Sequence, residues 1–155
     1  MGRVQGKVAF ITGAARGQGR AHAVKLAGEG ADIIAVDLCE NVDTIGYPLA
    51  TPEDLDETAA YVEKTGQRIV TAKADVRDAA ALKKALEDGI SQLGGVDIVI
   101  AQAGIAGMKG TPPLQAWTDV VNTNLIGTIN AIQVALPHLK EGASIVATGS
   151  TAALM

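Results

Sequence analysis

Residues 7–19 read KVAFITGAARGQG, a short apolar run rich in β-forming residues followed directly by a glycine-rich turn. Gly13, Gly17 and Gly19 carry no Cβ atom, so the backbone can approach a ligand closely. The first N–H groups of a helix that starts after this turn would point at an anion such as a pyrophosphate. The stretch therefore predicts a strand, a turn and a helix arranged around a bound dinucleotide.

A carboxylate ends the next apolar run, DIIAVD at residues 32–37. Asp37 can accept hydrogen bonds from both hydroxyls of an adenosine ribose. It would also repel the 2′-phosphate of NADP, whereas Arg16 inside the turn would attract that phosphate. Because the carboxylate both repels the phosphate and takes its space, we expect NAD as the cofactor and NADP as the less favoured one.

Composition limits the class of protein. A length of 155 residues suits one domain (residues 1–155), and 48% hydrophobic with 3% aromatic residues indicates an aliphatic α/β core. The net charge of −4 argues against a nucleic-acid partner. The single cysteine, Cys39, excludes an internal disulfide and fits a reducing compartment. We see no signal peptide, no stretch of bilayer length and no metal-ligand spacing, and so expect a cytoplasmic protein without a membrane or metal partner.

Apolar runs alternate along the chain with stretches of helical periodicity, which is typical of βαβ units and a buried parallel sheet. Right-handed crossovers would give the strand order 3-2-1-4-5, a Rossmann-type doubly wound sheet in three α/β/α layers. The ligand crevice is expected at the carboxyl ends of the strands, where the order reverses. Strands are predicted at residues 8–12, 32–37, 68–74, 97–101 and 144–148, and helices at 17–29, 52–65, 78–93 and 113–139.

One predicted connection is long. Residues 38–50, LCENVDTIGYPLA, follow the second strand, and loops of this length commonly serve a site or move. Because the segment starts beside Asp37, we expect it over the adenosine end of the cofactor or over the crevice.

Five motifs, in order along the chain, resemble the short-chain dehydrogenase/reductase family. TGAARGQG at residues 12–19 is similar to the family's TGxxxGxG cofactor turn, and Asp75-Val76 is similar to its adenine-contacting pair. Ala103-Gly104 matches the end of the family's Asn-Asn-Ala-Gly segment.

The remaining two motifs concern catalysis. NLIG at residues 124–127 matches the family's Asn-Leu-x-Gly element, and Ser150, after the run GASIV, matches its catalytic serine. The chain departs from the family at Gln102, which stands where asparagine is usual and would crowd the nicotinamide ribose.

The resemblance implies hydride transfer between NAD and a small secondary alcohol or carbonyl compound, with catalytic roles for Ser150 and Asn124. The segment at 38–50 and the run DVRD also resemble a carveol-dehydrogenase-like branch, which implies terpenoid substrates. Family members associate through the region of helix 113–139, so we expect a homo-oligomer, with Trp117 in the core or in a subunit contact. The cofactor contacts are assigned to Gly13, Arg16, Gly17, Gln18, Gly19, Asp37, Leu38, Asp75, Val76, Gln102, Ala103 and Gly104.

The family's Tyr-x-x-x-Lys pair is missing from these 155 residues. Tyr47 and Tyr61 are the only tyrosines, and a threonine stands four positions after each. In the family the tyrosine exchanges a proton with the substrate oxygen, and the lysine lowers its pKa from about 10. We therefore expect a C-terminally truncated member that lacks the family's last strands and is inactive alone, with an open apolar edge at residues 144–148. A non-catalytic NAD-binding or subunit-interaction module and a methyltransferase that binds S-adenosylmethionine remain as alternatives.

Overall fold

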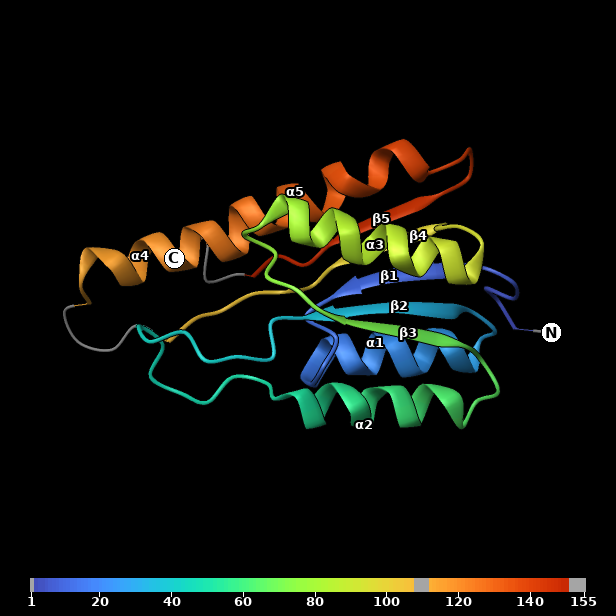
Figure 1. Cartoon of the computed structure of the whole chain (residues 1–155), viewed down its shortest axis with the longest axis horizontal. Coiled ribbons are helices and arrows are strands. Elements are labelled where there is room, and N and C mark those ends of the chain that lie inside the picture. Colours follow the sequence, from blue (N-terminus) through green and yellow to red (C-terminus); the bar gives the residue numbers. More distant parts are fainter. Residues whose placement is uncertain (1, 108–111, 151–155) are drawn as a thin grey trace.

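A computed structural model describes residues 2–107 and 112–150, which form a five-stranded parallel sheet with helices on both faces (Figure 1). The strand order is β3-β2-β1-β4-β5, so the predicted Rossmann-type doubly wound fold is confirmed. Every strand bound lies within one residue of its predicted position. The strands are β1 (Val8–Thr12), β2 (Asp32–Asp37), β3 (Ile69–Lys73), β4 (Ile98–Ala101) and β5 (Ser144–Ala147).

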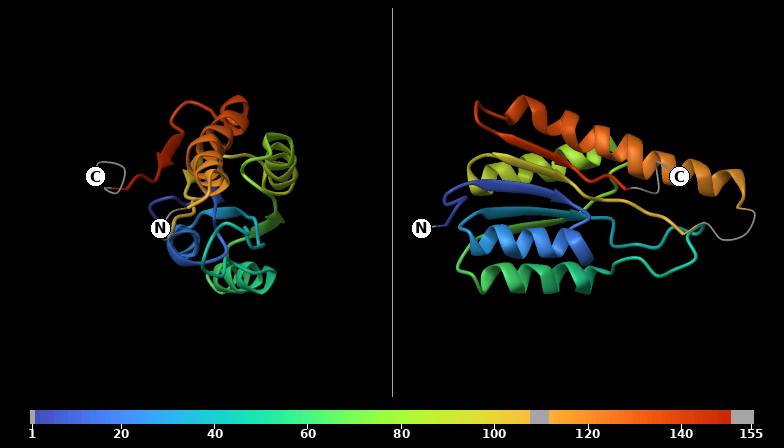
Figure 2. Two further views of the ribbon diagram at one scale, coloured as in Figure 1. Left: turned by 90° about the vertical axis from the view of Figure 1, so that its left-hand side faces the viewer. Right: turned by 180° about the vertical axis from the view of Figure 1, so that it is seen from behind.

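The helices form the two outer layers (Figure 2). One layer holds α1 (Gly17–Gly28) and α2 (Pro52–Glu63), and the other holds α3 (Ala79–Leu93) and α5 (Gly127–Ala135). Successive side chains of a strand point to opposite faces, so each of the inner strands β2, β1 and β4 serves two apolar cores. In β1, Phe10 packs in the core under α3 and α5, whereas Ile11 packs in the core under α1 and α2.

Side-chain caps fix the starts of two helices where the sequence predicts them. Thr51 Oγ1 accepts a hydrogen bond from the Asp54 N–H, and the Asp54 carboxylate accepts one from the Thr51 N–H. Pro52 occupies the first helical position, where its missing N–H is not needed. The Asp78 carboxylate caps α3 by accepting from two N–H groups of its first turn.

The prediction of one continuous helix over residues 113–139 is wrong in detail. The segment consists of α4 (Leu114–Val121), a π-helical turn η1 (Asn122–Ile126), α5 and a 3₁₀ turn η2 (Leu136–His138). The helix comes so close to the sheet end that a Cβ atom at Gly127 would overlap the side chain of Val76. A wide turn with its own tertiary contacts is a long-range feature that helical periodicity does not encode.

Apolar side chains remain exposed on β5 and along the α4–α5 helix. β5 is an edge strand, and Ile145 and Val146 are 42% and 47% exposed. Trp117 is 53% exposed, so of its two expected places the core is wrong and the subunit contact stays a prediction. Within the two described ranges, no helix has the length and apolar character needed to cross a bilayer. The exposed apolar residues of the helix are Leu114, Trp117, Val121, Leu125, Ile126, Ile129 and Leu136.

Candidate functional site

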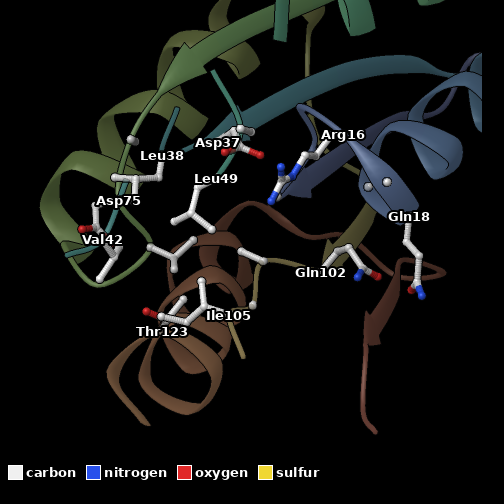
Figure 3. A pocket seen from close by; sticks show the side chains of 18 residues that line it. Arg16, Gln18, Asp37, Leu38, Val42, Leu49, Asp75, Gln102, Ile105 and Thr123 are labelled. Carbon is white, nitrogen blue, oxygen red and sulfur yellow. The ribbon is translucent and has the colours of Figure 1, made fainter. Parts of the chain in front are cut away.

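A cleft of about 310 Å³ opens at the carboxyl ends of the central strands (Figure 3). All the residues assigned above to cofactor binding line it, although they come from segments far apart in the chain. Asn124 and Ser150 are not among its lining residues. The cleft is lined by Gly13, Arg16, Gly17, Gln18, Gly19, Asp37, Leu38, Val42, Leu49, Ala50, Ala74, Asp75, Val76, Gln102, Ala103, Gly104, Ile105 and Thr123.

The glycine turn is built from close backbone contacts. Gly13 has φ +69°, and a Cβ there would lie 2.8 Å from Ala103 Cα. A Cβ at Gly19 would overlap the carbonyl oxygen of Gly13, so α1 can start against the turn only with glycine at this position. Gly17 has φ +56° and no neighbouring atom within 4 Å of an added Cβ. The missing Cβ atoms of Gly13 and Gly19 therefore allow the backbone of the turn to pack closely, whereas Gly17 faces open space.

The N-terminus of α1 faces this opening. Its N-cap residue is Arg16, which makes no side-chain capping bond, and its first turn holds no acidic residue. Within the described ranges the first N–H groups of α1 thus keep their capacity to bind an external acceptor. Together with the helix dipole, these groups attract an anion. The turn has the donor set that a pyrophosphate requires.

Asp37 is held in a fixed orientation at the end of β2. Its Oδ2 accepts from the Ala15 N–H at 3.0 Å, and its Oδ1 accepts from the Cys39 N–H at 3.2 Å. Figure 3 shows this carboxylate beside the Arg16 side chain at the same side of the cleft. Each carboxylate oxygen retains a second acceptor site for a ligand hydroxyl.

Buried Thr12 ties the end of β1 to the end of β4. Its Oγ1 accepts from the N–H groups of Gln102 and Ala103, both at 3.2 Å. The Gln102 side chain reaches in the other direction, and its Oε1 accepts from Thr148 Oγ1 at 2.6 Å. Gln102 thereby connects the cleft to the segment that follows β5, at the position where the sequence departs from the family pattern.

The Asp75-Val76 pair is held from two sides. The Arg77 guanidinium donates to both oxygens of Asp75, with Nε 3.0 Å from Oδ1 and 2.8 Å from Oδ2. Burial raises the pKa of the Asp75 carboxyl, but the bonds and charge of Arg77 outweigh burial and keep that pKa below its ordinary value. From the helix side, Asn130 Nδ2 donates to the Val76 carbonyl at 2.8 Å. The N-cap of α3 is Asp78, so Asp75 is free of that role.

Asn124 acts on the cleft through the backbone. Its Oδ1 accepts from the Ile105 N–H, and its Nδ2 donates to the Ile105 carbonyl, both at 2.8 Å. Ile105 lines the cleft and Asn124 does not. Ser150 is exposed and follows β5. The geometry makes Asn124 a positioning residue for the cleft wall.

Residues 38–50, which we call the strap, form a wall that sequence reasoning placed only approximately. Its residues Leu38, Val42, Leu49 and Ala50 line the cleft, and Ile105 and Thr123 lie at the opposite side (Figure 3). Of these residues only Leu38 was assigned in advance. Apolar residues spaced through a polar loop that begins next to Asp37 are the signal that could have identified Val42, Leu49 and Ala50.

The described residues contain no group of three or more His, Cys, Asp and Glu side chains that could hold a metal ion. Cys39, at the start of the strap, is 6% exposed. Burial, and then the charge of Asp37, raise the pKa of its thiol to about 11. The thiol is therefore protonated and unreactive while the strap covers it.

A family model described as short chain dehydrogenase matches residues 7–155. The chain belongs to the short-chain dehydrogenase family. The chain is 48% identical over 160 residues to (−)-trans-carveol dehydrogenase of Rhodococcus erythropolis, with 99% of the chain and 58% of the relative covered.

Two solved structures are similar to the chain. Carveol dehydrogenase from Mycobacterium avium in complex with NAD has a TM-score of 0.86 and 51% identity, covering 89% of this chain and 51% of that one. A short chain dehydrogenase from Mycobacterium paratuberculosis bound to NAD has a TM-score of 0.87 and 46% identity, covering 93% and 55%. The chain thus spans little more than half the length of the relatives it matches.

Proposed function

We propose that this chain binds NAD in the cleft and carries the nucleotide half of an oxidoreductase that acts on a small secondary alcohol or ketone. The observation that carries the proposal is the pairing of an open glycine turn at Gly13–Gly19 with the fixed carboxylate of Asp37 in one cleft. The two similar structures named above were both solved with NAD.

The residues of the cleft fit the parts of NAD. The first N–H groups of α1 would bind the pyrophosphate, and Asp37 would accept the adenosine ribose hydroxyls. Asp75 and Val76 would lie at the adenine, with Gln102, Ala103 and Gly104 toward the nicotinamide ribose. Asp37 would repel the 2′-phosphate of NADP more strongly than Arg16 attracts it, since Asp37 is held by two backbone bonds.

NAD, when bound, supplies the site that accepts or donates hydride. Of the chain's own residues, we assign Ser150 to hydrogen bonding of the substrate oxygen and Asn124 to fixing the Ile105 backbone. Neither tyrosine, Tyr47 or Tyr61, lines the cleft, so neither is placed to pass a proton to a substrate there. The Tyr47 hydroxyl accepts from the Ala106 N–H, and the Tyr61 hydroxyl donates to Glu57.

These 155 residues are therefore expected to bind NAD without turning over substrate, because general acid–base catalysis contributes about a hundredfold or more. A second candidate function is favoured by the absence of both tyrosines from the cleft lining. In that case the chain serves as a nucleotide-binding or subunit-interaction module that never performs hydride transfer itself.

Calorimetric titration tests the proposal. We expect heat with NAD and NADH, and much weaker binding of NADP. Asp37→Asn keeps an oxygen for the Ala15 N–H but removes the charge, so NAD affinity should fall roughly tenfold or more and NADP should gain relative to NAD. Absence of heat with both nicotinamide dinucleotides would overturn the proposal. In parallel, incubation with NAD and a panel of secondary alcohols should yield no NADH, and NADH formation would contradict the assignment of the chain as non-catalytic.

A further inference from the structure

The strap is fixed at two points on the far side of the cleft. Near its middle, Thr44 Oγ1 donates to Asp119 Oδ2 of α4 at 2.6 Å. Three residues later, the Tyr47 hydroxyl accepts from the Ala106 N–H at 3.0 Å. Figure 1 shows the strap leaving the sheet at the end of β2 and running out beneath α4. The strap is thus attached to α4 and to the segment after β4, and it is not a free loop.

Asp119 is the hub of the first attachment. Its side chain is only 10% exposed, and Thr44 and Gln115 both donate to it, the latter at 2.9 Å to Oδ1. Arg77 Nη1 lies 3.6 Å from the same Oδ1. Burying a carboxylate costs desolvation free energy, which hydrogen-bond donors and a nearby positive charge can offset. Here the partners come from the strap, from α4 and from the segment after β3.

Arg77 continues the connection to the cleft. Its Nη2 lies 2.6 Å from Asp75 Oδ2, and Asp75 lines the cleft. The chain of contacts therefore runs from Thr44 through Asp119 and Arg77 to Asp75. Asp119 itself does not line the cleft.

The second attachment joins the strap to the segment after β4. Gly107 has φ +101°, and an added Cβ would lie 2.7 Å from the Tyr47 ring, so the ring lies against the backbone there. Ala106 adjoins Ile105, whose backbone is bonded on both sides by Asn124. The strap and the segment after β4 thus hold each other in place.

We propose that Asp119 is a positioning residue for NAD binding. It holds the strap through Thr44 and orients Arg77 on Asp75, and through these two contacts it sets the shape of the cleft wall. This inference rests on the proposed function, because it concerns how the same cleft binds NAD. Asp119 does not line the cleft and acts through the strap and Asp75, which do.

Two variants of one side chain test the attachment. Thr44→Val keeps the shape of the residue but removes the donor to Asp119, whereas Thr44→Ser keeps the hydroxyl. Thr118→Val is the matched control, because Thr118 lies on α4 next to Asp119 and its hydroxyl bonds only the Leu114 carbonyl among the contacts described. Asp119→Ala removes the hub itself.

The single cysteine reports directly on the strap. Cys39 is buried in the same apolar cluster as Ala50, at the other end of the strap. Its reaction with a thiol reagent such as dithiobis(nitrobenzoate) therefore requires the strap to open. The labelling rate measures strap fixation without any cofactor, and NAD titration of the same samples measures binding.

We expect Thr44→Val and Asp119→Ala to label Cys39 roughly tenfold faster and to bind NAD roughly tenfold more weakly. Thr44→Ser should restore both values, and Thr118→Val should change neither. The double variant should lose no more than Asp119→Ala alone, because that variant already lacks the bond that Thr44→Val removes. Thermal melts should show that Thr44→Val stays folded.

Equal labelling rates in Thr44→Val and Thr118→Val would overturn the inference. So would faster labelling of Thr44→Val with unchanged NAD affinity, since the strap would then be fixed without effect on the cleft. If the unaltered chain binds no NAD, the proposed function fails instead, and the labelling rates still decide whether Asp119 fixes the strap.

Discussion

The side-chain amide of Asn124 bonds both the N–H and the carbonyl of Ile105, each at 2.8 Å. One residue of η1 thereby fixes the backbone of the segment that follows β4. Both groups of the amide are engaged, so the interaction depends on having a donor and an acceptor at one position. A role for Asn124 in shaping the cleft follows directly from this geometry.

Replacement of Asn124 should loosen that wall. We expect Asn124→Ala to lower the free energy of unfolding by about 1–3 kcal/mol, because it leaves two backbone groups of Ile105 without their partner. Asn124→Asp keeps the acceptor and loses the donor, so it should fall between Asn124→Ala and the unaltered chain. Urea titration followed by circular dichroism measures the change. Equal stability of all three proteins would show that water replaces the amide without loss.

Two glycines of α1 should respond in opposite directions to alanine. Gly19→Ala places a Cβ against the Gly13 carbonyl. It should destabilise the fold by about 1–3 kcal/mol or more and weaken NAD binding. Gly28→Ala has no heavy atom within 4 Å of the added Cβ and should be neutral or stabilise by up to about 1 kcal/mol. Thermal unfolding of the two variants side by side checks the pair. A loss of stability in Gly28→Ala as large as in Gly19→Ala would rule out the close-packing explanation.

The Asp119 carboxyl should make folding sensitive to acid. The hydrogen bonds from Thr44 and Gln115 are the largest of the effects that hold the pKa of Asp119 below its ordinary value of 3.8. The unfolded chain therefore takes up this proton first, and the stabilisation, complete above about pH 4, is lost as the pH falls through the folded-state pKa. Asp119→Asn and Thr44→Val should each give a shallower fall of unfolding free energy as the pH is lowered below about 4. Thr118→Val should keep the full slope, and a full slope in Asp119→Asn would contradict the assignment.

The Cys39 thiol predicts a matching effect at alkaline pH. Its folded-state pKa of about 11 lies above that of an exposed thiol, so stability is complete below about pH 8 and decreases as the unfolded chain loses the proton. Cys39→Ala should remove this alkaline decrease. Urea midpoints measured from pH 7 to pH 10.5 check it, and identical alkaline slopes with and without the thiol would refute it.

The exposed edge at β5 should promote association between copies. Ile145 and Val146 point to opposite faces of the strand, and both are more than 40% exposed. We propose that this edge and the apolar residues of α4–α5 drive homo-oligomer formation. Val146→Lys should lower concentration-dependent association, because a charge on an edge strand opposes pairing. Sedimentation velocity at several concentrations measures it, with Ala21→Lys, an exposed position of α1 in the opposite helix layer, as a control of equal charge change.

The sheet was predictable from sequence because its strands are continuous apolar runs, and parallel strands covered on both faces require that pattern. The cleft was predictable for the same reason: its residues follow strands whose carboxyl ends meet at one edge of the sheet. Asp37 and the glycine turn therefore needed only strand order to be placed together.

The strap contacts and the π turn were not predictable. Thr44 and Asp119 are 75 positions apart in the chain, and no local pattern links a threonine in a loop to an aspartate on a helix. Likewise, the turn at η1 widens to suit Val76 and Ile105, which belong to other segments. Local periodicity reports which face of a helix is apolar, but not where tertiary contacts change its winding.

The wide turn at η1 has a consequence for how this segment can vary in length. A π turn closes its hydrogen bonds over one residue more than an α-helix does, so the segment Asn122–Ile126 already holds an extra residue. Removing one residue there would let the turn wind as an α-helix and would keep Ala131 and Ala135 buried against the rest of the fold. Inserting one residue would instead turn the following helix by roughly 100° and carry those alanines out of the core, so a deletion at η1 should be tolerated better than an insertion.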